Sequence, residues 1–422
     1  SICGAIDLTS DDSLTVRAKR PGPFGPGLLV TAAFIGPGTV TTASIAGAGF
    51  GYALLWTLLF SVVATAVLQE MSARLGLVTR RGLSQAIRET FAGRWYGPLA
   101  VFLVVAAVGF GNAAYEAGNI TGAALGLQGI SGIPSWIWAL AVGLSSGALL
   151  LSGRYSLIEH VLVVLVLLMS TVFLLTFLMV RPPLETLVAG MLQPSLPEGS
   201  LLTAIALIGT TVVPYNLFLH SSAVQEKWRE DLPIADSLRA ARVDTGLSIG
   251  LGGLITLAIM STAAAAFFGS GAQVSAANIA QQLEPLLGSA ARYFFAAGLF
   301  AAGLSSAVAA PLAAAYAVCG ALGWERELSS LRFRMVWLLV LASGTFFAVI
   351  GTSPLAAILF AQAANGLLLP VCAVFLLLVM NRSQQLGDYR NGIASNVLGA
   401  FVVLVTLGLG GLKLLKVFGL VG

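Results

Sequence analysis

The sequence predicts an all-α integral membrane protein of about eleven transmembrane helices, and three observations support that prediction. Charged residues make up 9% of the 422 residues, whereas a soluble domain carries about 25%. Apolar residues make up 57% and the mean hydropathy is +0.92, so most of the surface must face lipid. The apolar runs are continuous and do not alternate as in a membrane β-barrel, so the backbone must satisfy its hydrogen bonds within helices.

Eleven apolar runs are long enough, or nearly so, to cross a bilayer as helices. They lie at 27–48, 51–73, 98–127, 135–152, 156–180, 200–225, 243–268, 290–320, 335–351, 354–380 and 392–420. The run at 335–351 is the shortest and could merge with its neighbour. Residues 1–24 are predicted to form a cytoplasmic N-terminal tail, and residues 25–422 a single transmembrane domain.

The basic residues predict how the chain is oriented. With a cytoplasmic N-terminus, eighteen of the 22 Lys and Arg fall on the cytoplasmic side, and only Arg181, Arg292, Lys413 and Lys416 fall on the other. This bias follows the positive-inside rule and favours an odd number of spans. The sequence therefore predicts a multi-pass protein of the cell (inner) membrane, with its N-terminus in the cytoplasm and its C-terminus outside.

The segment 74–97 carries five Arg and is predicted to be a long cytoplasmic loop. We interpret it chiefly as a basic loop that sets the topology. It could also contain a short amphipathic helix at the membrane surface.

Two of the predicted spans contain helix-breaking residues near mid-membrane. These are Gly36-Pro37-Gly38-Thr39 in the first span, and Thr210, Thr211, Pro214 and Asn216 in the sixth. Proline removes a backbone donor and clashes with the preceding turn. Backbone groups freed in this way are tolerated only where protein or a wet cavity satisfies them. Both spans are therefore predicted to be broken helices.

The positions of the breaks predict an inverted repeat. Spans one to five (25–180) and six to ten (200–380) form two halves of five helices each, and 392–420 is an extra helix. Because five is odd, the halves run in opposite directions across the membrane. Broken helices at matching positions of such repeats indicate the substrate site of a secondary transporter.

Several segments resemble one family, the Nramp divalent-metal transporters. They are GPGLLVTAAFIGPGTVTTASIAGAGFGYALLW from Gly25, LQEMSARLGLVTRRGLSQA, GTTVVPYNLFLHSS, AAGLSSAVAAPLAAAYAVCG and AQAANGLLLP. The match runs from about Gly25 to the tenth helix, and its ordered segments are more specific than any one motif. The resemblance implies the inverted-repeat, LeuT-type fold, with alternating access and a divalent cation as substrate.

The departures from the family pattern fall on its ion site. Where the family has Asp-Pro-Gly-Asn, this chain has Gly36-Pro37-Gly38-Thr39, without the carboxylate or the amide. Where the family has Met-Pro-His, it has Val213-Pro214-Tyr215, without the thioether or the His. Asn216 and His220 match the family in this helix.

What remains at the site is neutral. The residues predicted to bind substrate are Gly36, Thr39, Thr210, Val213, Tyr215, Asn216, Gln362 and Asn365, partly through carbonyls freed by the breaks. Thr39, Thr210 and Asn216 are weak metal ligands at most. Such groups could hold a hydrated ion such as Mg²⁺, which gives up its waters reluctantly, or a polar organic solute. They should hold a bare dication poorly, since no anion offsets its lost hydration.

One carboxylate, Glu116, lies well inside a predicted span and shares a helix face with Asn112 and Asn119. Because charge there costs about 3 kcal/mol on insertion scales, we expect Glu116 to be protonated at rest. With Asn112 and Asn119 it is a candidate for a proton or cation pathway, and a structural hydrogen bond is the alternative. His220, one turn after the sixth-helix break, is a second candidate for proton transfer. Glu70 is expected to pair with Arg.

These observations favour a secondary transporter with weak or no proton coupling, because the family's first-helix carboxylate is missing. The substrate expected is hydrated Mg²⁺ or weakly selected Mn²⁺; a polar organic solute, or a scaffold that has lost transport, are the alternatives. The sequence lacks HExxH, GxSxG and P-loop motifs, so no enzyme is predicted. No cofactor and no nucleic-acid partner are expected. The partners predicted are the lipid bilayer and the transported solute, and the protein is expected to be a monomer.

Overall fold

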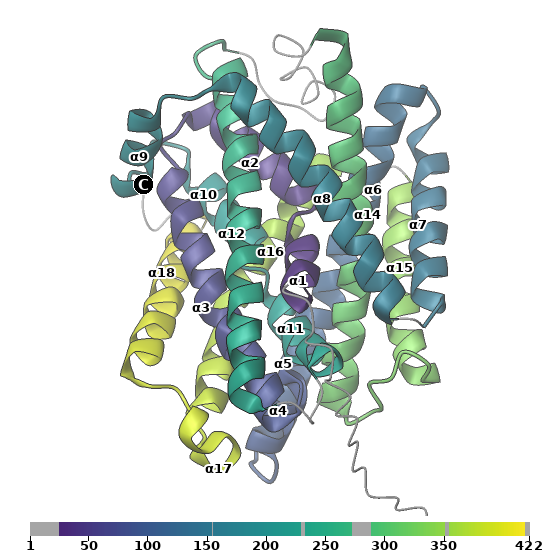
Figure 1. Cartoon of the computed structure of the whole chain (residues 1–422), viewed down its shortest axis with the longest axis vertical. Helices are drawn as coiled ribbons and strands as arrows, with labels where there is room; N and C mark the ends of the chain where they lie inside the picture. The colour runs from purple at the N-terminus through teal and green to yellow at the C-terminus, as the bar shows by residue number, and fades with distance from the viewer. Residues whose placement is uncertain (1–24, 154, 229–232, 272–287, 351–353, 418–422) are drawn as a thin grey trace, which may run out of the picture.

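The computed structural model describes residues 25–153, 155–228, 233–271, 288–350 and 354–417. Within these ranges every regular element is a helix, and the helices form one elongated bundle (Figure 1). The predicted tail at 1–24 lies outside the described residues. The all-α class predicted from composition is therefore confirmed.

Each predicted span falls on a helix or on a pair of helices. In the order of the eleven predicted spans, these helices are α1 (Pro26–Phe34) with α2 (Pro37–Phe50); α3 (Leu55–Thr79); α5 (Gly97–Val104) with η1 (Val105–Phe110) and α6 (Gly111–Ser131); α7 (Ser135–Leu151); α8 (Tyr155–Val180); α10 (Leu201–Thr211) with α11 (Pro214–Lys227); α12 (Ile234–Phe267); α14 (Ala291–Leu322); α15 (Leu331–Val349); α16 (Pro354–Met380); and α18 (Ile393–Val417). In the third span, α5 continues through the π-helical turn η1 into α6. The short elements are α4 (Leu83–Phe91), α9 (Leu184–Leu192), η3 (Gly288–Ala290), α17 (Ser383–Leu386) and η4 (Gly387–Tyr389).

Length and hydropathy alone mark seven of the described helices as membrane spans. An eighth candidate is the bent pair formed by Ser170–Val180 of α8 and by α9, which turns by 114°. The first predicted span does not qualify because it is divided into two short helices. The seventh span begins at Ile234, nine residues before its predicted start, because Ala, Leu and Arg continue the helix beyond the apolar run.

Both predicted breaks are present. Pro37 and Pro214 each occupy the first turn of the second half-helix, where a missing N–H costs nothing. The residues between the half-helices are Ile35–Gly36 in the first break and Val212–Val213 in the second. Thr210 and Thr211 therefore end α10, and do not lie in the break itself as the sequence pattern suggested.

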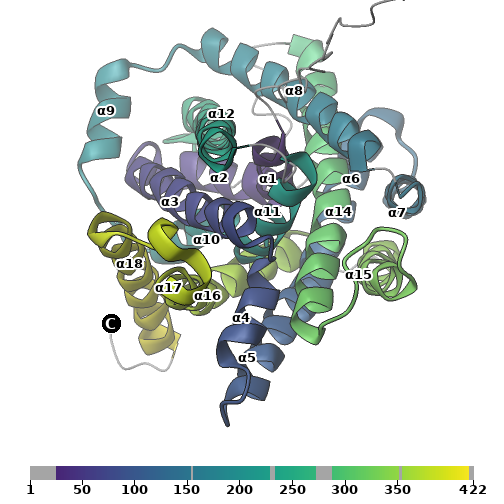
Figure 2. The same cartoon turned by 60° about the horizontal axis from the view of Figure 1, so that its bottom comes forward.

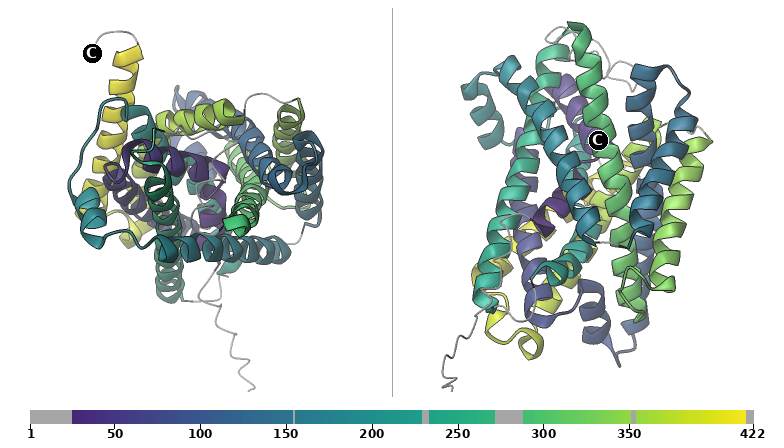
Figure 3. Two further views of the ribbon diagram at one scale, coloured as in Figure 1. Left: turned by 90° about the horizontal axis from the view of Figure 1, so that it is seen from above. Right: turned by 45° about the vertical axis from the view of Figure 1, so that its right-hand side comes forward.

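The broken helices occupy the middle of the bundle. α1 packs against α8, α11, α12 and α14, and α10 packs against α2, α3 and α16. Seen with the bottom of Figure 1 turned forward, α1 and α11 lie inside a ring formed by the longer helices (Figure 2). Seen from above and from the side, α7 and α15 stand together at the periphery (Figure 3).

The outer faces of the peripheral helices are apolar and exposed. Leu339 of α15, Leu404 of α18 and Val164 of α8 are each more than 60% accessible. Since exposed leucine and valine stripes on several long helices have no partner in water, these faces contact lipid. The chain is thus a multi-pass membrane protein.

The basic loop predicted at 74–97 differs from the expectation. α3 extends to Thr79, and α4 follows at Leu83–Phe91. The apolar face of α4, including Leu83, Ala86 and Ile87, is fully buried against α14 and its neighbours. The segment does contain the short amphipathic helix offered as an alternative, but protein and not lipid covers its apolar face. We refer below to the end of the bundle that carries this helix as the α4 end.

Candidate functional site

Two side chains at the start of α11 bond to carbonyl groups in the last turns of α1. The Tyr215 hydroxyl donates to the carbonyl oxygen of Ala33 at 2.8 Å, and Nδ2 of Asn216 donates to that of Val30 at 3.3 Å. The α1 carbonyls predicted to be free for a substrate are therefore engaged. Local sequence could not show this, because the donors lie more than 180 residues away.

One carbonyl group inside each break is engaged as well. The Gly36 carbonyl accepts from the amides of Thr39 and Val40, and the Val213 carbonyl accepts from the amide of Asn216. Gly36 and Val213 thus shape the backbone but present no free carbonyl of the kind expected from sequence.

Two threonines join the half-helices in the middle of the bundle. We call this region the centre and define it by Thr39, Thr210, Asn216, Gln362 and Asn365. The Thr39 hydroxyl lies 2.7 Å from the Thr210 hydroxyl and donates to the carbonyl oxygen of Phe34. Beside them, the amide nitrogen of Gln362 on α16 lies directly over Gly38, so a β-carbon at position 38 would overlap it. The structure therefore brings Thr39, Thr210 and Gln362 together.

Four polar atoms at or near this centre lack a hydrogen-bond partner among the described residues. They are Oδ1 of Asn216, Oε1 of Gln362, Nδ2 of Asn365 and the hydroxyl of Tyr115. A buried polar group without a hydrogen-bond partner costs about 1–3 kcal/mol. A molecule that forms hydrogen bonds with these four atoms would therefore bind more favourably. Three of the four atoms are oxygens, and each belongs to a neutral side chain.

The side chains of the centre are buried in this conformation. Thr39, Thr210 and Asn216 have no accessible surface, and Gln362 and Asn365 have 4% or less. A substrate could reach them only after the surrounding helices move.

Glu116 and Asn119 form a buried pair beside the first break. Nδ2 of Asn119 donates to Oε2 of Glu116 at 3.1 Å, while Oε1 of Glu116 has no partner. The stem of Glu116 packs against Gly344 of α15. Asn112, predicted to share their face, donates instead to the carbonyl of Ala310 on α14 at 2.9 Å. The polar face of α6 thus divides into a pair near the break and a bridge to α14.

His220 lies on α11, toward the α4 end from the centre. Its Nδ1 is 3.0 Å from Oε1 of Gln69 on α3, its Nε2 is unpartnered, and the ring is fully buried. The imidazole therefore bridges α11 and α3, and the centre does not include it.

Three residues near the broken helices were not singled out from the sequence. Tyr115 stands next to Glu116, yet a tyrosine in an apolar run looks like ordinary core. Ser306 lies beside Gly36, and a β-carbon at position 36 would be 2.8 Å from its hydroxyl oxygen. Asp244 sits at the start of a predicted span, where acids usually face water, but here it is fully buried. No periodicity distinguishes these three.

Neither carboxylates nor thiols gather at the centre. Among the described residues no group of three or more His, Cys, Asp and Glu side chains could hold a metal ion. The donor set offers hydroxyls and amides only. It fits a cation that keeps its waters better than one that must shed them.

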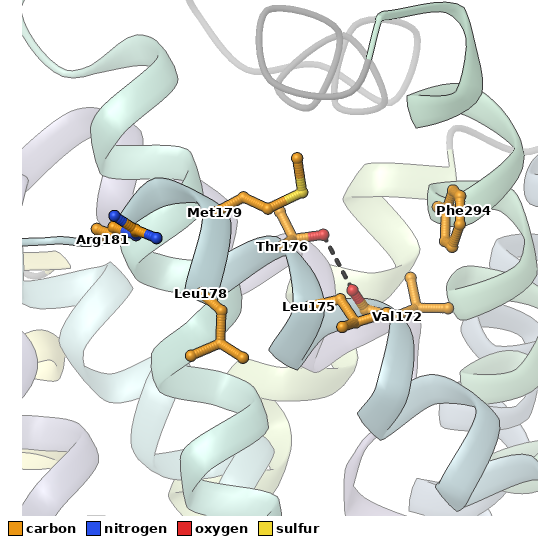
Figure 4. Close-up of a pocket in the computed structure, with 7 residues that line it drawn as sticks. All are labelled: Val172, Leu175, Thr176, Leu178, Met179, Arg181 and Phe294. Atoms are coloured by element: carbon orange, nitrogen blue, oxygen red, sulfur yellow. Dashed lines mark hydrogen bonds between the residues drawn. The ribbon is translucent and has the colours of Figure 1, made fainter.

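A separate cavity of about 490 Å³ lies between the end of α8 and α14, away from the breaks (Figure 4). Its lining residues are Val172, Leu175, Thr176, Leu178, Met179, Arg181 and Phe294. The Thr176 hydroxyl there is already bonded to the carbonyl of Val172, at 2.9 Å. Because the one charged lining residue is an arginine, this cavity does not suit a cation.

Comparisons with known proteins agree with the fold. Residues 27–416 match the family model described as Natural resistance-associated macrophage protein-like (Nramp). The chain is 30% identical to the divalent metal cation transporter MntH of Deinococcus radiodurans, over 95% of this chain and 91% of that protein.

Two solved structures show the same architecture. A manganese transporter of Eremococcus coleocola has a TM-score of 0.76 at 23% identity, over 92% of this chain and 85% of that one. MhsT, solved in complex with L-phenylalanine, has a TM-score of 0.62 at 17% identity, over 93% and 99%. At these identities the likeness shows the fold, which is the LeuT-type inverted repeat with broken first and sixth helices.

Proposed function

The chain belongs to the Nramp family, and on that premise we propose that it is a secondary transporter that moves a divalent cation by alternating access. The family is one of transporters, so the chain is not an enzyme, as the sequence predicts. MntH of Deinococcus radiodurans, by its name, carries divalent metal cations. That substrate class is the starting point for this chain.

The observation that carries the finer proposal is the set of unpartnered oxygens at a neutral centre. Waters bound to a cation point their hydrogens outward, so a hydrated ion must be met by hydrogen-bond acceptors. Oδ1 of Asn216 and Oε1 of Gln362 are such acceptors and are buried. Two carbonyls near the end of α1, those of Ala33 and Val30, are already engaged by Tyr215 and Asn216. We therefore propose a cation that keeps part of its water shell, Mg²⁺ in preference to Mn²⁺.

The test is uptake into proteoliposomes, with Mg²⁺ and Mn²⁺ compared in parallel and an ionophore control for vesicle integrity. Saturable Mg²⁺ uptake, inhibited by hexaamminecobalt(III), would support the proposal. That complex does not exchange its ligands, so it can occupy only a site that accepts an intact shell. Mn²⁺ uptake without such inhibition would indicate direct coordination. Uptake of neither ion would contradict cation transport and return attention to polar organic solutes.

We propose further that proton coupling is weak or absent. Among the described central side chains none is a carboxylate, and the nearest acid, Glu116, is bonded to Asn119. Uptake should therefore leave the internal pH of the vesicles unchanged. A substrate-dependent acidification that is lost in Glu116→Gln or His220→Ala would overturn this and place a proton route through that residue.

We also propose the topology that the basic residues favour, with the N-terminus in the cytoplasm, the C-terminus outside, and a monomeric protein in the inner membrane. The α4 end is then the cytoplasmic end, since α3 ends and α12 begins there.

A further inference from the structure

One face of α6 lies along the first break. Gly122 contacts the ring of Pro37 so closely that a β-carbon at position 122 would overlap it. Three residues earlier, Oδ1 of Asn119 lies beside Gly36. Tyr115 is four residues before Asn119, so it occupies the same face of the helix. This face leads from the first break toward the second.

The Tyr115 side chain reaches the centre itself. Its ring packs edge-on against the ring of Tyr215, with centroids 5.6 Å apart. Its hydroxyl faces Gln362, Thr210 and Tyr215, yet forms no hydrogen bond of good geometry with any of them. The residue is 2% exposed. α6 therefore contributes a phenol to a centre otherwise built from the two broken helices and α16.

The Tyr115 hydroxyl and Oε1 of Gln362 are both buried, and neither has a hydrogen-bond partner among the described residues. Tyr215 differs, because its hydroxyl is committed to the Ala33 carbonyl. A phenol oxygen can accept a hydrogen bond from an ion-bound water and can also donate one. The same oxygen is a poor ligand for a bare soft metal, which favours sulfur and nitrogen.

We infer that Tyr115 contacts the transported cation through its retained water and helps to select a hydrated ion over a bare one. This inference rests on the proposed transport of a divalent cation and adds to it a residue and a means of selection. The alternative is that an ordered water satisfies Tyr115 in every state, which would make its role purely structural.

The experiment compares Tyr115→Phe with the wild type and with Tyr316→Phe in Mg²⁺ uptake. Tyr115→Phe removes the hydroxyl and keeps the ring that packs on Tyr215. Tyr316 is a matched control, since it is equally buried, packs edge-on against Phe333, and lies on α14 outside the centre. Loss of one hydrogen bond to cargo predicts a rise of about three- to tenfold in the KM for Mg²⁺, with no change in Tyr316→Phe.

A second measurement separates cargo contact from structure. The increase in melting temperature on adding Mg²⁺ should shrink in Tyr115→Phe and stay unchanged in Tyr316→Phe. A structural role would lower the melting temperature without Mg²⁺ and leave the Mg²⁺-dependent increase intact, and that result would overturn the inference.

A second variant, Tyr115→Met, keeps the inference testable if the first one folds poorly. Its thioether should raise Cd²⁺ uptake relative to Mg²⁺ by roughly fivefold or more, because soft ions prefer sulfur. An unchanged ion preference in a folded Tyr115→Met protein would count against the inference.

If the wild type transports Mg²⁺ and both variants match it, a role for Tyr115 in binding the cation is excluded, while the proposed function stands. If the wild type transports no divalent cation, both the proposed function and the inference about Tyr115 are contradicted.

Discussion

The centre of the bundle and its α4 end use polar residues in opposite ways. At the centre the side chains are neutral and several oxygens have no partner. At the α4 end, Glu70 accepts from Arg74 at 3.0 Å and from Arg242 at 2.9 Å. Arg74 also donates to the carbonyl oxygen of Tyr389, at 2.6 Å. The pairing of Glu70 with Arg predicted from the sequence is confirmed.

Asp244, on α12, is a second acid whose two carboxylate oxygens are both bonded. Its two carboxylate oxygens accept from the backbone amides of Gly25 and Gly27, at 2.9 and 2.7 Å. The carboxylate thus caps the start of α1 from another helix, where the helix dipole favours negative charge. Gly27 allows this approach, because a β-carbon there would lie 2.7 Å from the Asp244 carbonyl oxygen.

The difference indicates a division of labour. At the α4 end, charged groups are bonded to one another and to the backbone, whereas at the centre several uncharged polar groups have no partner among the described residues. If this division is right, adding charge at the centre should change specificity, and removing charge at the α4 end should change stability.

The largest effect is expected from adding a carboxylate to the centre with Gly36→Asp in a Ser306→Ala background. The second substitution makes room, because a β-carbon at position 36 meets the Ser306 hydroxyl at 2.8 Å. A carboxylate near a dication gains several kcal/mol, and its desolvation offsets part of this. We expect a net gain of about 3 kcal/mol, or roughly a hundredfold in Mn²⁺ affinity, measured by calorimetric titration.

The control for that variant is Gly36→Asn with Ser306→Ala, which has the same shape without the charge. Equal Mn²⁺ affinity in the Asp and Asn variants would show that charge is not what the centre lacks.

The next effect is expected from Asp244→Asn at the α4 end. Asn retains one acceptor oxygen but places an NH₂ group against a backbone N–H. Because hydrogen bonds to charged groups contribute about 1.5–3 kcal/mol each, we expect a loss of about 2–3 kcal/mol and a lower melting temperature in detergent. Asp388→Asn, an exposed acid at the same end, serves as the comparison and should melt like the wild type. If the Asp244→Asn variant melts at the same temperature as the wild type, the Asp244 carboxylate does not stabilise the start of α1.

The smallest effect is expected from Arg242→Ala. The Arg242 side chain is 57% exposed in its pair with Glu70, and Arg74 still pairs with Glu70 without it. Exposed ion pairs contribute about 0.2–1 kcal/mol and are screened by salt. The melting temperature should fall slightly at low salt and match the wild type at high salt. A large fall in the melting temperature that does not depend on salt would mean that the Arg242–Glu70 pair is effectively buried.

The sequence predicts the architecture well because lipid imposes it locally. Twenty apolar residues must form a helix in a bilayer wherever they occur, so each predicted span is a helix or a broken helix. The breaks follow equally from local chemistry, since Pro37 and Pro214 cannot continue a preceding turn. Thr39 and Thr210 could be named because matching breaks in inverted repeats must meet, and Gln362 could be named from the resemblance of the tenth span to the family.

What the sequence did not predict depends on partners distant in the chain. The burial of α4 was missed because an amphipathic pattern does not say whether lipid or protein covers the apolar face. The extended start of α12 was missed because the helix continues past the membrane boundary on which the prediction relied.

The sequence by itself determined the class of the protein, its broken helices and the neutral character of its centre, because these follow from composition and from covalent geometry. Only the tertiary structure decided which groups remain free. Tyr215 and Asn216 engage the α1 carbonyls, Asp244 caps α1, and Tyr115 faces the centre with an unmet hydroxyl. A hydrogen bond needs two atoms within about 3 Å, and packing alone brings together residues so far apart in the chain.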